Sequence, residues 1–199
     1  MARSREFDTD EAMDAALRAF HAAGYEATSL ADLLEATGLA RQSLYNAFGD
    51  KRALFLACLR RFAETGNDAL EQSLARGSVR AAIRSVFEQT LALPRDSMRR
   101  GCFVLNSAGE MGARDRDVAQ IAASSLERQE QLFADALRRG VRRRELALTA
   151  RRIEELARFL VGALQGLRMV ARADPASPAL RDVATVALRT LDDAARRPR

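Results

Sequence analysis

Apolar residues recur at intervals of three and four along most of the chain, which is the spacing of one face of an α-helix. The first such series is Met13, Ala16, Leu17 and Phe20, and Gly24 follows it as a C-terminal stop. No stretch alternates between apolar and polar residues with the period of two that a β-strand requires. The pattern therefore predicts an all-α fold of about nine helices.

Two short helices are predicted next. Ser29 followed by Asp32 resembles a capping box, with Asp in place of the usual Glu, and the helix that it opens ends at Gly38. A second short helix runs from about Ala40 to Phe48. The connection between them is short enough to hold two helices at a steep angle, so the pair is predicted to form a helix-turn-helix.

The rest of the chain also has a helical pattern. A longer helix begins at Lys51, and a break is expected at Gly77. The helix at about 149–172 is apolar on more than one face, which indicates that it packs against two partners. The other helices are predicted at about 79–91, 99–112, 118–141 and 180–191. We expect a helix-turn-helix domain at residues 1–50 and a second helical domain at residues 51–199.

The helix at 40–48 has an unusual polar face. Leu44 stands on its narrow apolar side, whereas Arg41 is four residues before Tyr45 and Gln42 is four residues before Asn46. Residues at this spacing are neighbours on a helix surface. Paired hydrogen-bonding side chains of this kind suit contact with a flat, polar surface outside the protein.

Composition sets limits on the class of protein. The chain has 199 residues, of which 48% are hydrophobic, and this is enough for a substantial core. Its net charge is +5, but 31 of its 32 basic residues are arginine, a bias typical of genome composition. Residues 1–60 hold seven basic and nine acidic side chains, a net charge of −2. Bulk charge therefore does not argue for DNA binding, which depends on local placement.

We expect a cytoplasmic protein with no membrane association. The start, MARSREFDTDEAMD, lacks the apolar run of a signal peptide. No apolar stretch approaches the roughly 18 residues of a membrane span. The two cysteines are too few for a disulfide framework.

The sequence contains few candidate residues for catalysis or for metal binding. His21 is the only histidine, and we interpret it as a surface residue. Glu110, Asp115 and Asp117 stand near a helix break among arginines, and we interpret them as a solvated charge cluster rather than as catalytic carboxylates. We therefore expect no enzyme activity, no cofactor and no metal site.

The segment AALRAFHAAGYEATSLADLLEATGLARQSLYNAFGDKRALF resembles the DNA-binding domain of the TetR family of bacterial transcriptional regulators. The match is ordered over some forty positions, from an alanine-rich first helix ending in Phe and Gly-Tyr to an aromatic residue followed by Lys and Leu. The resemblance implies phosphate contacts from Thr28, Ser29, Tyr45 and Lys51 and base contacts from Arg41, Gln42, Ser43 and Asn46. The chain departs from the family pattern at Ala31, Ala40 and Ala47. At each position alanine removes a contact that a larger or polar side chain could make.

The resemblance also implies how the protein works. We expect a homodimer that represses transcription from an inverted-repeat, double-stranded DNA operator until a small-molecule inducer releases it. Arg3 and Arg5 are expected to reach the DNA as an arm. The walls of the ligand pocket are expected to include Phe87, Leu91, Cys102, Asn106, Phe133 and Phe159.

Three alternatives to a ligand-responsive regulator stay open from the sequence. Cys102 follows two arginines at the start of an apolar helix, a setting that lowers a thiol pKa. Because the thiolate is the reactive form, one alternative is a repressor that responds to oxidants or electrophiles through Cys102. Cys58, in contrast, is expected in the core. A small helical enzyme and an all-α interaction module are the remaining alternatives. Activation in place of repression is also compatible with the sequence.

Overall fold

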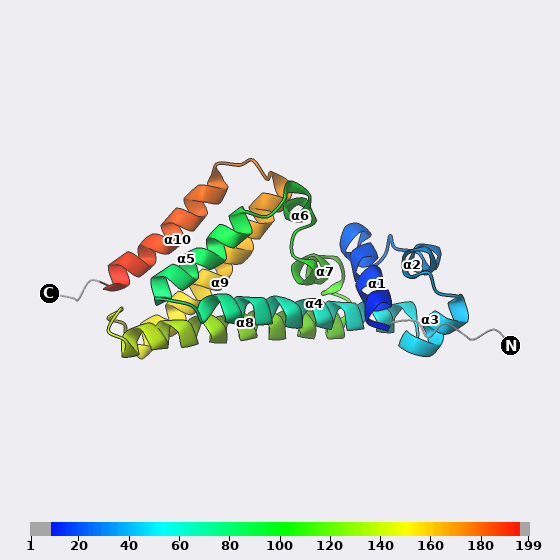
Figure 1. Ribbon diagram of the computed structural model, residues 1–199, viewed down its shortest axis with the longest axis horizontal. Coiled ribbons are helices and arrows are strands. Elements are labelled where there is room, and N and C mark those ends of the chain that lie inside the picture. Colours follow the sequence, from blue (N-terminus) through cyan, green and yellow to red (C-terminus); the bar gives the residue numbers. More distant parts are fainter. Residues whose placement is uncertain (1–8, 196–199) are drawn as a thin grey trace. The chain divides into compact units, whose positions relative to one another are not determined.

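The predicted all-α class is confirmed by a computed structural model, which describes residues 9–195. That range contains ten α-helices and no strand (Figure 1). The helices are α1 (Thr9–Ala23), α2 (Leu30–Thr37), α3 (Arg41–Phe48), α4 (Lys51–Leu74), α5 (Val79–Leu91), α6 (Arg95–Arg100), α7 (Phe103–Met111), α8 (Arg116–Arg142), α9 (Ala150–Ala173) and α10 (Ala179–Ala195). None of these described helices is long and apolar enough to cross a membrane.

The helix beyond the expected nine is α6. The sequence pattern predicted a single helix at about 99–112, whereas the structure divides this stretch at Gly101. Gly101 has a φ of 69°, in the left-handed region that glycine adopts without steric cost. Pro94 precedes α6, where its missing N–H is not needed. The local chemistry of proline and glycine therefore ends one helix and starts another.

Packing divides the chain into two units. One unit comprises the described residues up to Glu64 together with Phe103–Ala122, and the other comprises Thr65–Cys102 together with the described residues from Ala123 onward. Helices α4 and α8 therefore each contribute residues to both units. The division by packing does not follow the order of the chain, and a functional boundary after residue 50 stays a prediction.

The first unit has an aromatic core. Phe20 of α1 and Phe55 of α4 are fully buried and meet edge to face, with their ring centroids 5.1 Å apart. Phe103 of α7 meets Phe55 in the same way at 5.7 Å. Such edge-to-face pairs add about 0.5–1.5 kcal/mol to the burial of the rings. Helix α7 is thus part of the core on which the helix-turn-helix is built.

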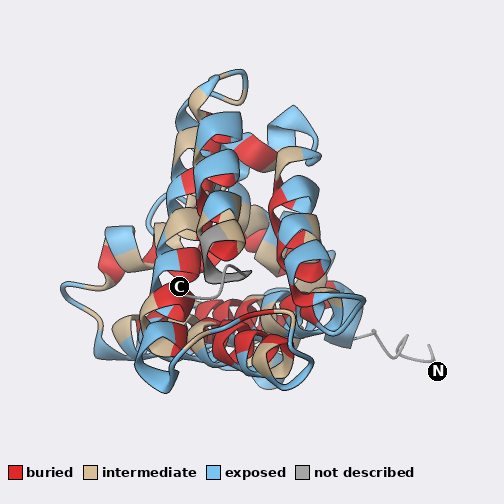
Figure 2. Ribbon diagram, turned by 90° about the vertical axis from the view of Figure 1, so that its left-hand side faces the viewer, coloured by how far each residue is buried: buried red, intermediate tan, exposed pale blue. Residues whose placement is uncertain are grey.

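The second unit has a larger aliphatic core. Its buried residues come chiefly from α5, α8, α9 and α10, and they line one side of each helix (Figure 2). Helix α8 lies close to α5 at Gly140, where a Cβ atom would stand 2.7 Å from Val79 Cγ1. The start of α5 is held by Glu145, whose carboxylate accepts a 2.7 Å hydrogen bond from the Val79 N–H. Small residues and caps thus allow the helices of this unit to pack closely.

Candidate nucleic-acid interface

The predicted capping box at the start of α2 is confirmed. Ser29 Oγ accepts a hydrogen bond from the Asp32 N–H at 3.1 Å, and Asp32 Oδ2 accepts one from the Ser29 N–H at 2.7 Å. The hydrogen bonds from Ser29 hold the pKa of Asp32 below its usual value, the backbone N–H having the larger effect. Two N–H groups at the start of α2 are satisfied in this way.

The turn between α2 and α3 is built by Gly38. Its φ is 68°, and its N–H donates a 2.9 Å hydrogen bond to the Leu34 carbonyl, which closes the C-terminus of α2. Helix α3 begins three residues later, at Arg41, after the N-cap residue Ala40, whose methyl side chain makes no capping hydrogen bond. The first N–H groups of α3 therefore lack a side-chain acceptor at the N-cap. Groups of this kind attract an anion such as a phosphate.

The polar face of α3 has the paired arrangement that the sequence predicts. Gln42 Nε2 donates a 2.9 Å hydrogen bond to Asn46 Oδ1, and both side chains are exposed. The Arg41 guanidinium carbon lies 5.8 Å from the centroid of the Tyr45 ring. Leu44, on the opposite side, is completely buried. The buried leucine fixes which face of α3 points outward, and the pairings hold the polar side chains in place.

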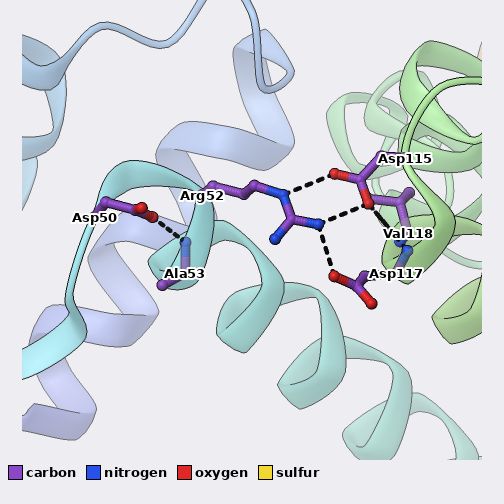
Figure 3. Close-up of polar contacts among 6 residues, drawn as sticks. All are labelled: Asp50, Arg52, Ala53, Asp115, Asp117 and Val118. Carbon is purple, nitrogen blue, oxygen red and sulfur yellow. Dashed lines mark hydrogen bonds and ion pairs between the residues drawn. The ribbon is translucent and has the colours of Figure 1, made fainter.

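Lys51 lies at the first position of α4, as expected. Its ammonium stands 4.4 Å from the centroid of the Tyr25 ring, within the range of a cation–π interaction. The start of α4 is capped by Asp50, whose Oδ1 accepts a 2.7 Å hydrogen bond from the Ala53 N–H (Figure 3). This carboxylate occupies the N-terminus of α4, where free N–H groups would otherwise attract a phosphate. A phosphate contact in this region therefore depends on the lysine ammonium.

Thr28 and Ser29 differ in how available their hydroxyl groups are for a contact with phosphate. Thr28 is 1% exposed, and its hydroxyl donates a 2.6 Å hydrogen bond to the Gly24 carbonyl. Ser29 is exposed, and its oxygen accepts the capping-box hydrogen bond from the Asp32 N–H. A phosphate contact from Ser29 is compatible with this arrangement, whereas the Thr28 hydroxyl is directed into the protein. Ser43 is half-buried on α3.

The interpretation of Glu110 as part of a solvated charge cluster is wrong. Its carboxylate accepts hydrogen bonds from two consecutive backbone N–H groups, Tyr25 at 3.1 Å and Glu26 at 2.9 Å. A Cβ atom at Gly24 would stand 2.8 Å from Glu110 Oε2, so the carboxylate lies directly against this turn. No spacing in the sequence indicates a contact across 85 residues.

Asp115 and Asp117 are also structural. Arg52 of α4 donates to both carboxylates, as Figure 3 shows. The Asp115 side chain is only 9% exposed, and it also caps α8 by accepting hydrogen bonds from the N–H groups of Asp117 and Val118. The hydrogen bonds from Arg52 hold the pKa of Asp115 below its usual value. The three acidic residues thus attach α7 and the start of α8 to the α1–α2 turn and to the first turn of α4.

His21 is not a simple surface residue either. Its ring contacts two aromatic rings, with centroid distances of 5.3 Å to Phe62 and 5.4 Å to Phe103, and it is half-buried. Cys58 is completely buried, as expected, and burial raises the pKa of its thiol to about 12. Arg3 and Arg5 lie outside the described residues.

The residues expected in a ligand pocket do not form one group. Phe87 and Phe133 are fully buried in the core of the second unit, and Leu91 packs against that core. Cys102 and Asn106 are half-buried, and Asn106 belongs to the first unit. Phe159 is 42% exposed on α9. The pocket therefore stays a prediction, and the exposure of Phe159 does not suit a pocket wall.

Comparison with known proteins agrees with this geometry. The model of bacterial regulatory proteins of the tetR family matches residues 12–58, and that of the tetracyclin repressor-like C-terminal domain matches residues 78–188. The uncharacterized HTH-type transcriptional regulator YezE of Bacillus subtilis (strain 168) is 37% identical over 194 residues, which cover 96% of this chain and 100% of YezE. The HTH-type transcriptional repressor ComR of Escherichia coli (strain K12) is 32% identical over 190 residues, covering 94% and 90%.

A solved structure is similar over nearly the whole chain. It is that of a cysteine-substituted variant of the TetR family transcriptional regulator CifR, complexed with 26-bp double-strand operator DNA. The TM-score is 0.78 and the identity 30%, covering 96% of this chain and 98% of CifR. Two family models and relatives matched over most of their length thus agree with the helix-turn-helix. The chain belongs to the TetR family of bacterial transcriptional regulators.

Proposed function

We propose that this chain is a transcriptional repressor that binds double-stranded operator DNA through α3. The observation that carries the proposal is the outward polar face of α3, with its Arg41–Tyr45 and Gln42–Asn46 pairs and an N-terminus that no side chain caps. ComR, which is similar over most of its length, is described as a repressor, and CifR was solved on its operator. Such a regulator acts in the cytoplasm, where its DNA is.

The proposed contacts divide into two classes. Arg41, Gln42, Ser43 and Asn46 are assigned to base edges, since arginine pairs with guanine and an amide with adenine through two hydrogen bonds. Ser29, Tyr45 and Lys51 are assigned to phosphates, together with Thr28 if its hydroxyl is released from Gly24. Phosphate contacts set the position of the protein, and base contacts select the sequence.

We further propose that the functional form is a homodimer joined through α9 and α10, which pack against each other within the subunit. Phe159 and Met169 of α9 are 42% and 56% exposed, and Val186 of α10 is 54% exposed. Between the first two stand Gly162 and Gly166, on the same helix face, where an added Cβ atom would meet nothing within 4 Å. An open apolar face with small residues is suited to close packing against a second copy.

The proposed signal is a small molecule that binds the second unit and lowers the affinity for DNA. Phe87, Leu91 and Phe133 remain the proposed apolar walls, with Cys102 as the residue that carries a polar group. A ligand of this kind acts only through its different affinities for the DNA-binding and DNA-released states, typically about 1–3 kcal/mol of coupling.

A second form of this proposal is a response of Cys102 to oxidants or electrophiles. Cys102 is a free, half-buried cysteine directly before α7, whereas the Cys58 thiol is buried and its pKa is raised to about 12. If Cys102 is the sensor, Cys102→Ser abolishes release of DNA by an electrophile such as N-ethylmaleimide, and Cys58→Ser does not. An intact response in Cys102→Ser contradicts this form and leaves the ligand-responsive repressor unaffected.

A mobility-shift experiment tests the proposed function. The probe is the DNA directly upstream of the chain's own coding sequence, with a shuffled duplex of the same composition as control. A shift of the upstream fragment at nanomolar protein that the shuffled duplex does not compete away supports the proposal. Equal binding of the two duplexes contradicts operator recognition, and no binding at all favours an enzyme or an interaction module.

A further inference from the structure

We propose that Glu110 is a positioning residue for DNA binding, which acts through Tyr25 on the ammonium of Lys51. The inference rests on the proposed function, in which Lys51 contacts a phosphate. It adds a residue of α7, outside the helix-turn-helix, to the machinery that sets DNA affinity.

The first link joins Glu110 to the α1–α2 turn. Each carboxylate oxygen accepts one backbone N–H, from Tyr25 and from Glu26. These N–H groups are consecutive, so a single carboxylate fixes the orientation of the intervening peptide plane. Gly24 allows the approach, since a Cβ atom there would collide with Oε2 at 2.8 Å. The backbone position of Tyr25 is therefore determined by a side chain 85 residues away.

The second link joins Tyr25 to Lys51. The Tyr25 ring lies against Phe55, with centroids 4.8 Å apart, and parallel to Phe20 at 6.3 Å. The Lys51 ammonium stands 4.4 Å from the centroid of the same ring. A long lysine side chain has many rotamers, and a cation–π contact favours the one that places the ammonium over the ring. Tyr25 thus holds the proposed phosphate ligand in place before DNA arrives.

Helix α7 is held at both ends, which allows Glu110 to transmit its position. Phe103 at its start is buried against the rings of Phe55 and Phe62, each at 5.7 Å. Glu110 lies in its last turn, and Asp115, four residues beyond α7, is bound by Arg52. The chain enters α7 directly from the other unit, between Cys102 and Phe103. A displacement of α7 that withdraws Glu110 would therefore release the Tyr25 turn and weaken phosphate binding.

The test is a double-mutant cycle between Glu110→Ala and Lys51→Ala. The probe is a duplex that the wild-type protein selects from a random pool, and the dissociation constant is measured from 50 to 300 mM NaCl. Lys51→Ala is expected to lower the slope of log K against log salt by about 1 for each bound subunit. Glu110→Ala is expected to weaken binding roughly threefold to tenfold and to lower the salt slope by part of the Lys51→Ala change, because the ammonium remains but is no longer held in place. In the Lys51→Ala background Glu110→Ala should cause no further loss.

Two further variants separate positioning from stability. Tyr25→Leu removes the ring and should behave like Glu110→Ala, whereas Tyr25→Phe keeps the ring and should bind more tightly than Tyr25→Leu. Glu127→Ala, which removes an exposed carboxylate of α8, is the matched control and should bind like the wild type. Thermal unfolding is measured for every variant to test whether the protein is folded at the temperature of the assay. If Glu110→Ala is not folded, Glu110→Gln, which keeps one acceptor oxygen, takes its place.

The outcomes distinguish this inference from the proposed function. Additive losses from Glu110→Ala and Lys51→Ala, or an unchanged salt slope in Glu110→Ala, overturn the positioning role and leave operator binding intact. Wild-type affinity in Lys51→Ala overturns both the phosphate contact and the inference. Failure of the wild-type protein to select any duplex contradicts the proposed function itself.

Discussion

The guanidinium of Arg52 donates two 2.9 Å hydrogen bonds to the carboxylate of Asp115, which lies 63 residues further along the chain. The same carboxylate caps α8, so one side chain both starts a helix and binds that helix to the first turn of α4. Paired hydrogen bonds between arginine and a carboxylate fix orientation as well as distance. Arg52 directly follows Lys51, so this bond lies beside the proposed phosphate contact.

Removing this pair should change how stability depends on pH. Arg52 holds the pKa of Asp115 below its usual value. An acid with a lowered pKa stabilises the fold above its unfolded pKa, about 3.9 for aspartate, and this stabilisation is lost as the pH falls through the folded pKa. Asp115→Asn keeps a cap for α8 but cannot titrate. Between pH 5 and pH 2 the free energy of unfolding should therefore fall more in the wild type than in Asp115→Asn. Urea denaturation at each pH measures it. Parallel curves of unfolding free energy against pH would contradict the role of the Arg52–Asp115 pair.

Substitutions of base-reading residues should reduce sequence discrimination, whereas substitutions of phosphate-binding residues should reduce affinity for any DNA. Arg41→Ala and Asn46→Ala are expected to reduce discrimination between operator and shuffled DNA by about 1–3 kcal/mol each. Lys51→Ala is expected to weaken binding to both duplexes equally and to lower the slope of log K against log salt. Competition binding against the two duplexes measures both effects. Equal, sequence-independent losses from all three variants would count against the base-reading assignment.

Gly24→Ala should destabilise the protein for two separable reasons. Gly24 has a φ of 85°, and an added Cβ atom would stand 2.8 Å from Glu110 Oε2. Strain of this kind costs about 1–3 kcal/mol. Gly38→Ala is the matched control, because its φ is 68° but nothing lies within 4 Å of the added atom. Chemical denaturation should show a larger loss for Gly24→Ala, and a Glu110→Ala background should abolish the difference.

The proposed dimer face should be sensitive to size at Gly166. Within one subunit an added Cβ atom meets nothing within 4 Å there, and replacing glycine in a helix interior gains up to about 1 kcal/mol of helix stability. Gly166→Leu should therefore stay folded but become monomeric at micromolar concentration in light scattering. Ala123→Leu, at an exposed position of α8, is the control and should keep the wild-type mass. A dimeric Gly166→Leu would place the interface elsewhere.

The two cysteines should react at very different rates. Burial raises the pKa of the Cys58 thiol to about 12, whereas Cys102 is half-buried. Since the thiolate is the reactive form, a disulfide reagent at pH 8 should modify one thiol rapidly in the native protein and two after unfolding. Cys102→Ser should remove the rapid phase, and Cys58→Ser should leave it. Two slow phases in the wild type would show that Cys102 is protected as well.

The sequence alone determined the features whose partners lie within one turn of the chain. The capping box of Ser29 and Asp32, the left-handed turn at Gly38 and the pairing of Gln42 with Asn46 are all confirmed. Each depends on backbone geometry at a fixed spacing, and a helix repeats that spacing wherever it forms. The order of these features over forty positions was also enough to indicate the family.

The tertiary structure decided what the same residue types do when their partners are distant. From the sequence Glu110 and Asp115 were interpreted as a solvated cluster, yet they bind the α1–α2 turn and Arg52, and His21 contacts two phenylalanine rings. The predicted pocket residues likewise fall into different groups. These contacts join residues 41 to 85 positions apart along the chain, and their formation depends on how whole helices pack. No periodicity along the chain encodes that packing, because the free energy comes from burying surfaces together.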